Sequence, residues 1–209
     1  GLLPLEARSA DRYLLGFGSW LGVALVAADG LKEREDLDRV LKALVLLATG
    51  SALIGIFQFY GFDLTPYIRM PGLVYNSDLV GLGQRGGPEF NRVYGTQQHY
   101  IEFGVVLAMV IPIAIHRALS APYPRAAFRA WACVGIMAFA IPFSISRAGF
   151  LGLVVGFAAI SLVWPRRLLM PALFVACIGL VAFRGIVPGV LGTIKSAFLN
   201  FENDPSIIN

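Results

Sequence analysis

Apolar residues gather into six long blocks along the chain, separated by polar or charged stretches. A helix rises about 1.5 Å per residue, so about 20 apolar residues cross a bilayer and about 17 can still do so. The second, third and fourth blocks reach this length easily, whereas the other three are short. The pattern predicts an all-α polytopic membrane protein with about six transmembrane helices, covering about Tyr13–Ala28, Leu37–Tyr60, His99–Leu119, Ala126–Ile145, Ala148–Trp164 and Leu168–Phe183.

The boundary between the fourth and fifth blocks is predicted from a single charge. Arg147 lies inside an otherwise uncharged run from Trp131 to Trp164. One continuous helix over that run would be about 50 Å long, far more than the roughly 30 Å hydrocarbon core. An arginine at mid-bilayer would also cost roughly 2.5–3.5 kcal/mol. We therefore expect a hairpin at Ser144–Arg147, with Pro142 ending one helix and Arg147 in the first turn of the next.

Composition supports the membrane assignment. Of 209 residues, 57% are hydrophobic and 14% are charged, whereas soluble domains carry about 25% charged residues. The net charge of +4 is scattered between apolar blocks and forms no basic stripe. Nucleic acid is therefore not an expected partner, and the basic residues are better suited to anchoring helix ends at membrane lipids.

Charge placement also predicts orientation. Lysines and arginines crowd the short loops around residues 32–42, 117–129 and 166–167, which favours the cytoplasmic side for these loops. Residues 61–98 then form a long outer-face loop, and residues 184–209 begin a larger one. We expect residues 1–209 to be one transmembrane helical domain and a fragment of a larger bundle, because the chain ends on an unfinished polar stretch.

Two arginines are predicted to share one membrane face. Two crossings, the third and fourth blocks, separate Arg92 from Arg147, so both lie on the same side and each precedes or begins a helix. Helix amino-termini attract anions, and two guanidinium forks suit a phosphate or diphosphate. The hypothesis is a lipid-linked pyrophosphate bound by Arg92 and Arg147. The alternative is that both arginines simply anchor helix ends at the membrane surface.

His99 is the candidate catalytic residue at the start of the third block. It could act as a general base or as a hydrogen-bond donor to a phosphate, or merely cap the helix beside Thr96. No cluster of His, Cys and Asp at metal-ligand spacing occurs, so neither a metal nor another cofactor is expected. The spacings Gly18–Gly22 and Gly152–Gly156 fit close helix packing.

The motifs "RVYGTQQH" and "SISRAGFLGLVVG" together resemble the O-antigen ligase/polymerase family. The family pattern has an arginine shortly before Gly-Thr, often a His-Pro-Asn after it, and a Ser-Arg-x-Gly turn. Tyr100 and Ile101 replace the Pro and Asn of the pattern. The resemblance covers about residues 90–165, and the matching positions are Arg92, Gly95, Thr96, His99, Ser146, Arg147 and Gly149.

The resemblance implies a metal-independent glycosyltransferase of the GT-C type in the bacterial cytoplasmic membrane. Such proteins take part in polysaccharide biosynthesis of the cell envelope, transferring or polymerising glycan from an undecaprenyl-pyrophosphate donor at the outer face. The resemblance also implies that arginines bind the donor, here Arg92 and Arg147. The acceptor is a lipid or a glycan, activated by a histidine in a large outer loop that would lie beyond Asn209.

Two other functions fit the same residues. A transporter or flippase for an anionic lipid-linked substrate would need polar groups near mid-membrane, and Thr49–Ser51 is the main such stretch. A non-catalytic membrane scaffold would use the arginines only as anchors and would tolerate their replacement by alanine.

Overall fold

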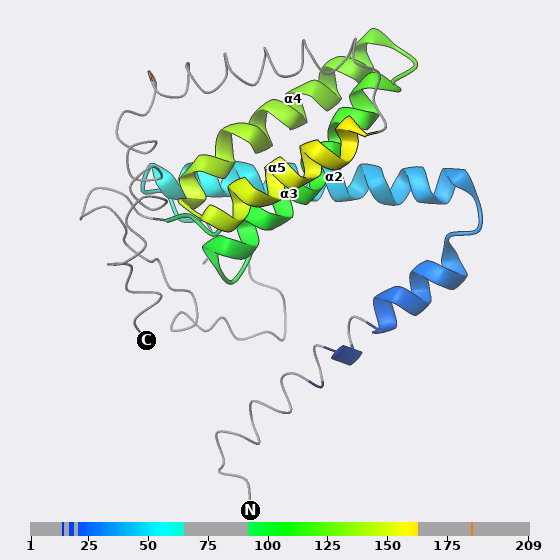
Figure 1. Ribbon diagram of the computed structural model, residues 1–209, viewed down its shortest axis with the longest axis horizontal. Coiled ribbons are helices and arrows are strands. Elements are labelled where there is room, and N and C mark those ends of the chain that lie inside the picture. Colours follow the sequence, from blue (N-terminus) through cyan, green and yellow to red (C-terminus); the bar gives the residue numbers. More distant parts are fainter. Residues whose placement is uncertain (1–13, 15–16, 19–20, 65–91, 163–184, 186–209) are drawn as a thin grey trace, which may run out of the picture. The chain divides into compact units, whose positions relative to one another are not determined.

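The computed structural model describes residues 14, 17–18, 21–64, 92–162 and 185, and all regular elements within these ranges are helices (Figure 1). The chain divides into two compact units, residues 1–43 and 44–209. The first unit contains the apolar helix Leu21–Gly30 and the start of α2. The labelled helices are α2 (Arg34–Phe59), α3 (Tyr100–Leu119), α4 (Pro124–Ala140) and α5 (Arg147–Ser161), with a short 3₁₀ helix at Ile141–Ser144.

Three of the described helices are long and apolar enough to cross a membrane, which indicates a membrane protein. They are α2, α3 and the stretch Pro124–Ser144. The apolar helices Leu21–Gly30 and α5 are shorter than the other three. The predicted block Leu168–Phe183 lies outside the described residues, as do residues 65–91 of the first predicted outer-face loop and all of the second except residue 185. The count of six spans therefore stays a prediction.

Glycine ends α2 in a defined way. Gly61 has φ +89°, a left-handed conformation that a residue without Cβ adopts at little cost. The Phe62 N–H donates to the Phe57 carbonyl at 2.9 Å, and the Gly61 N–H donates to the Gln58 carbonyl at 3.1 Å. This pair of bonds is a Schellman motif. It turns the chain back at the end of α2, so that Asp63 lies beside Gln58.

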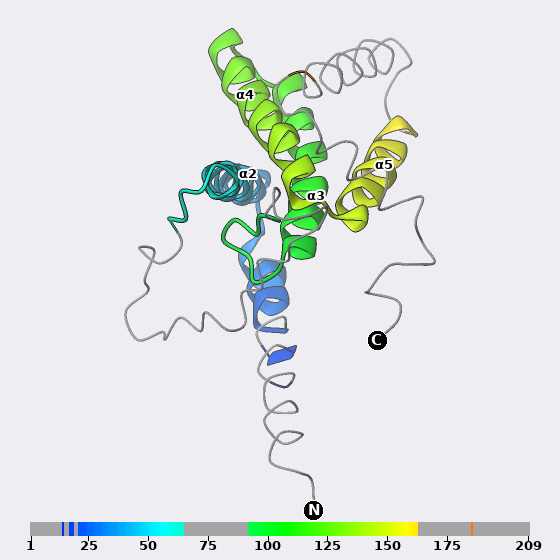
Figure 2. The same cartoon turned by 90° about the vertical axis from the view of Figure 1, so that its left-hand side faces the viewer.

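Within the second unit, α3 packs against both α4 and α5 (Figures 1 and 2). The contact between α3 and α5 is made by small residues in matching order along both helices. A Cβ added to Gly149 would lie 3.0 Å from the Gly104 Cα, and one added to Gly152 would lie 3.3 Å from the Ala108 Cβ. Further along, a Cβ at Gly156 would meet Pro112 of α3 at 3.2 Å. The two helices are therefore parallel and begin at the same end.

The predicted close packing at Gly152–Gly156 is confirmed by these contacts. The same prediction for Gly18–Gly22 has no such support, because an added Cβ at either glycine would meet nothing within 4 Å in the described part of the chain.

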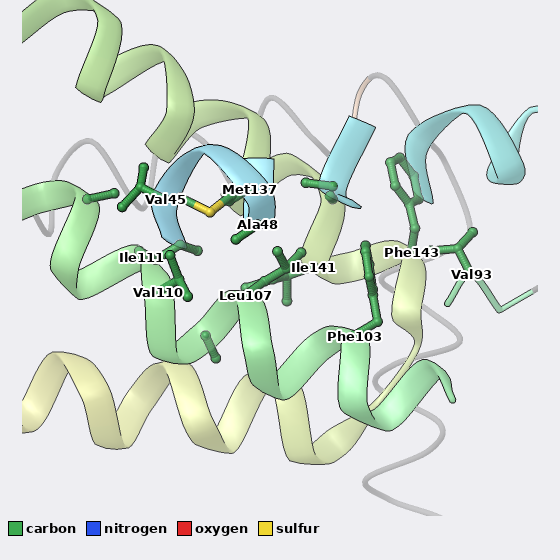
Figure 3. Packing of buried hydrophobic residues seen from close by; sticks show 14 of the residues in the cluster. Val45, Ala48, Val93, Phe103, Leu107, Val110, Ile111, Met137, Ile141 and Phe143 are labelled. Carbon is green, nitrogen blue, oxygen red and sulfur yellow. The ribbon is translucent and has the colours of Figure 1, made fainter. Parts of the chain in front are cut away.

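The apolar core of the second unit lies between α2, α3 and the end of α4 (Figure 3). Phe103, Leu107 and Met137 are fully buried. Gly55 of α2 leaves room for Phe103, since an added Cβ would lie 2.6 Å from the ring. This packing fixes the start of α3, where the sequence places its candidate site. The labelled members of the cluster are Val45, Ala48, Val93, Phe103, Leu107, Val110, Ile111, Met137, Ile141 and Phe143.

The predicted helix break before Arg147 is confirmed. α4 ends at Ala140, the 3₁₀ helix that contains Pro142 follows, and α5 begins at Arg147. The Ser144 hydroxyl donates to the Ile141 carbonyl at 2.8 Å and thereby closes the 3₁₀ turn.

Candidate functional site

The segment before α3, residues 92–99, is bound to α2 through one amide side chain. Gln58 Oε1 accepts from the Gly95 N–H at 2.9 Å and from the Tyr94 N–H at 3.3 Å. Its Nε2 donates to the Gly95 carbonyl and to Asp63 Oδ1, both at 3.1 Å. All four hydrogen-bonding positions of the amide are therefore used. Asp63 completes the arrangement by accepting from the Tyr94 hydroxyl at 2.9 Å.

Ser51, two turns before Gln58 on the same helix, holds the next part of the segment. Its hydroxyl accepts from the Thr96 N–H at 3.2 Å and donates to Gln97 Oε1 at 2.9 Å. Because residues seven apart lie on one face of a helix, Ser51 and Gln58 form a polar stripe in the uncharged C-terminal part of α2. This stripe fixes the path of residues 94–97.

Gly95 must be glycine for this path. Its φ is +60°, and an added Cβ would lie 2.6 Å from both Ser51 Oγ and the Phe103 ring. The positive φ and the lack of room for a Cβ thus both require glycine at this position. The Gly-Thr pair of the family pattern is in this chain the point where the segment touches α2.

Arg92 lies at the start of this segment and is buried, with 8% of its surface exposed. Its guanidinium carbon lies over the Tyr100 ring, 4.2 Å from the ring centroid. The neighbouring Val93 N–H donates to the Phe143 carbonyl at 3.2 Å. That bond ties the backbone beside Arg92 to the corner that leads into α5.

Arg147 is the first residue of α5 and is half-buried. The residue that turns the chain toward it is Ile145, which has φ 46° and ψ 38° and is 1% exposed. A β-branched residue in the left-handed region is strained. Tertiary packing of the buried Ile145 side chain therefore maintains the corner that aims the chain into α5.

The two predicted arginines belong to the same end of the α3–α5 pair. The parallel contact of Gly104 with Gly149 places the starts of both helices together. Arg92 precedes one start and Arg147 forms the other. Two helix amino-termini and two guanidinium groups contribute positive charge at this end, alongside the carboxylates of Asp63 and Glu102.

His99 is the N-cap of α3. Its Nδ1 accepts from the Ile101 N–H at 3.3 Å, and its ring packs on Tyr100 with 4.0 Å between centroids. The structure thus places His99 in the capping position that was one of its three predicted roles. The catalytic role stays a prediction.

Replacing His99 with alanine is expected to lower the free energy of unfolding by about 1 kcal/mol, because an N-cap acceptor is lost. Asparagine can accept the same bond, so His99→Asn should recover most of this loss. Thermal unfolding in detergent would compare the two variants. Equal melting temperatures for them would contradict the capping role.

Three residues of the site were not predicted from the sequence. Gln58 and Asp63 hold residues 94–95, and Tyr100 stacks on Arg92. The available signal was the polar stripe of Ser51 and Gln58 within the uncharged C-terminal part of α2. In the described ranges, no group of three or more His, Cys, Asp and Glu side chains is placed to hold a metal ion.

No family model, curated protein or solved structure matches this chain.

Proposed function

We propose that Arg92 and Arg147 bind the pyrophosphate of a lipid-linked glycan donor, and that the protein transfers or polymerises that glycan at the outer face of the bacterial cytoplasmic membrane. The observation that carries the proposal is the parallel contact of α3 and α5, with an arginine at each helix start. The likeness of the two motifs to the O-antigen ligase/polymerase family supplies the reaction class.

The reaction requires positive charge near the leaving group. An acceptor hydroxyl attacks the anomeric carbon of the donor sugar, and the bond from that carbon to the pyrophosphate oxygen breaks. The bond electrons go to undecaprenyl pyrophosphate, whose charge Arg92 and Arg147 stabilise. Fixed donors stabilise such charge best in a water-poor site, and the burial of Arg92 fits this requirement. The hydroxyl proton goes to a base. His99 is the candidate in this chain, and to accept the proton it would have to release the Ile101 N–H from Nδ1, because the other nitrogen of the neutral ring carries a hydrogen.

The transporter alternative has less support. Its main sequence feature was the polar stretch Thr49–Ser51 in α2. The Thr49 hydroxyl donates to the Val45 carbonyl of its own helix at 2.7 Å, and Ser51 binds residues 96–97. Both hydroxyls thus serve helix and loop structure and leave the transporter without a mid-membrane polar path in the described part of α2.

The test is glycan transfer from an undecaprenyl-pyrophosphate donor by the full-length protein in proteoliposomes. Arg92→Ala and Arg147→Ala are each expected to lower the rate about 100-fold, the effect of losing one charge-stabilising donor. Arg147→Lys should recover little, because a point charge cannot reproduce the guanidinium fork. Lipid and glycan acceptors in separate reactions would distinguish ligation from polymerisation.

Arg129→Ala is the matched control, since Arg129 is exposed on α4, which begins at the opposite end of α3. It should keep full activity, and melting temperatures would exclude misfolding of the other variants. A fully active Arg147→Lys would count against the proposal. Full activity of both alanine variants would favour the scaffold function.

A further inference from the structure

Tyr100 occupies the position where the family pattern has proline, directly after the capping histidine. Proline offers no aromatic face, whereas the Tyr100 ring lies under the Arg92 guanidinium, 4.2 Å from centroid to Cζ. We propose that Tyr100 is a positioning residue of the donor site, which holds the Arg92 guanidinium in the plane that presents its N–H groups to the pyrophosphate. This inference rests on the proposed function.

The geometry of a stacked guanidinium gives the reason. The N–H bonds of arginine lie in the plane of the group, so a ring on one face covers no donor. Stacking also removes conformational freedom from a side chain with about 2 kcal/mol of rotamer entropy. A guanidinium held in this way loses less freedom when it binds an oxyanion edge-on, which strengthens binding.

Tyr100 is itself held in place from two sides. It is the first residue of α3, so its backbone is fixed by the helix start. The His99 ring packs on it at 4.0 Å with a tilt of 34°, and His99 is fixed by its bond to the Ile101 N–H. The cap of α3, the tyrosine and the arginine thus form one continuous contact series. The series ends at the Arg92 guanidinium, the charged group that the donor would meet.

The arrangement also restricts what Arg92 can bind. One face of the guanidinium is covered by Tyr100, and its Nε is buried, so a ligand would reach the group through its terminal N–H groups. Phosphate oxygens bind these groups with two parallel hydrogen bonds. A diphosphate group is therefore a better match than a neutral sugar for this position.

A double-mutant cycle on binding tests the inference. The affinity of the full-length protein in detergent for farnesyl pyrophosphate would be measured for wild type, Tyr100→Leu, Arg92→Ala and the double variant. Tyr100→Leu is expected to weaken binding about ten-fold through loss of the cation–π contact and of the guanidinium orientation. Tyr100→Phe keeps the ring and should stay within about two-fold of wild type. In the Arg92→Ala background, Tyr100→Leu should have no further effect.

The outcomes separate this inference from the proposed function. Loss of binding in Arg92→Ala with wild-type affinity in Tyr100→Leu would overturn the role of Tyr100 and leave the arginine site intact. Wild-type affinity in Arg92→Ala would overturn both. An equal loss from Tyr100→Leu in both backgrounds would show that Tyr100 acts independently of Arg92 and would also overturn the inference.

An unstable Tyr100→Leu protein would be replaced by one with pentafluorophenylalanine at position 100, with Tyr100→Phe as its reference. This ring has nearly the same size but an electron-poor face, so it weakens the attraction to the guanidinium without opening a cavity. Weaker farnesyl pyrophosphate binding at an unchanged melting temperature would support the inference. Unchanged affinity would overturn it.

Discussion

Gly149→Val is expected to destabilise the protein by about 3 kcal/mol, at the upper end of the usual cost of overpacking. An added Cβ at Gly149 would lie 3.0 Å from the Gly104 Cα and 3.2 Å from the Gly104 carbonyl carbon. These are backbone atoms of α3, which cannot rotate away as a side chain would. The helices must separate at their starts, and the packing along Gly152 and Ala108 weakens with them.

The control is the same substitution at Gly135, an exposed glycine of α4 where an added Cβ meets nothing within 4 Å. Gly135→Val should change stability by no more than about 0.5 kcal/mol, because valine has a similar or slightly better helix propensity than glycine. Thermal unfolding in detergent compares the two. Equal melting temperatures would contradict the close α3–α5 contact.

Gly149→Val also tests the site. Separation of the two helix starts would move Arg147 away from the segment that carries Arg92. We therefore expect farnesyl pyrophosphate binding to fall in any Gly149→Val protein that remains folded, and to stay at the wild-type level in Gly135→Val.

Local signals explain how much of the fold could be predicted. The length of the uncharged run around Arg147 requires a break in the helix, and the break is present. Gly61, after the last apolar turn of α2, is a normal C-terminal helix signal, and the helix ends there. The prediction that Arg92 and Arg147 share one membrane face needs only an even number of crossings between them. It does not depend on the exact helix boundaries.

The site depended on contacts that no local pattern contains. Gln58 and Gly95 are 37 residues apart, and nothing near either residue indicates the other. Ile145 is an unfavourable residue for a left-handed conformation, so propensity argues against the turn that packing enforces. Tyr100 is the first residue of α3, and its contact with Arg92 depends on the folded path of residues 92–99, which the sequence alone does not indicate.

The largest loss of stability is expected from Gln58→Leu, at about 4 kcal/mol. Leucine has a similar volume but no polar atoms, so the buried Tyr94 and Gly95 N–H groups lose their acceptor and the Gly95 carbonyl loses its donor. Each buried polar group left without a partner costs about 1–3 kcal/mol. Water that enters beside Asp63 would partly replace the lost hydrogen bonds, which keeps the total cost below the sum of the three separate costs.

Hydrogen exchange gives a local measure of the same change. In Gln58→Leu the amide hydrogens of Tyr94 and Gly95 should exchange faster, whereas those in the middle of α3, around Leu107, should change only with global stability. Gln98→Leu is the matched control, because Gln98 is exposed on the same segment and its replacement should change stability by no more than about 0.5 kcal/mol. Protection of Tyr94 and Gly95 equal to wild type would show that this amide does not hold the segment. In that case another contact would have to fix the backbone next to Arg92, and the bond from the Val93 N–H to the Phe143 carbonyl would be the next candidate.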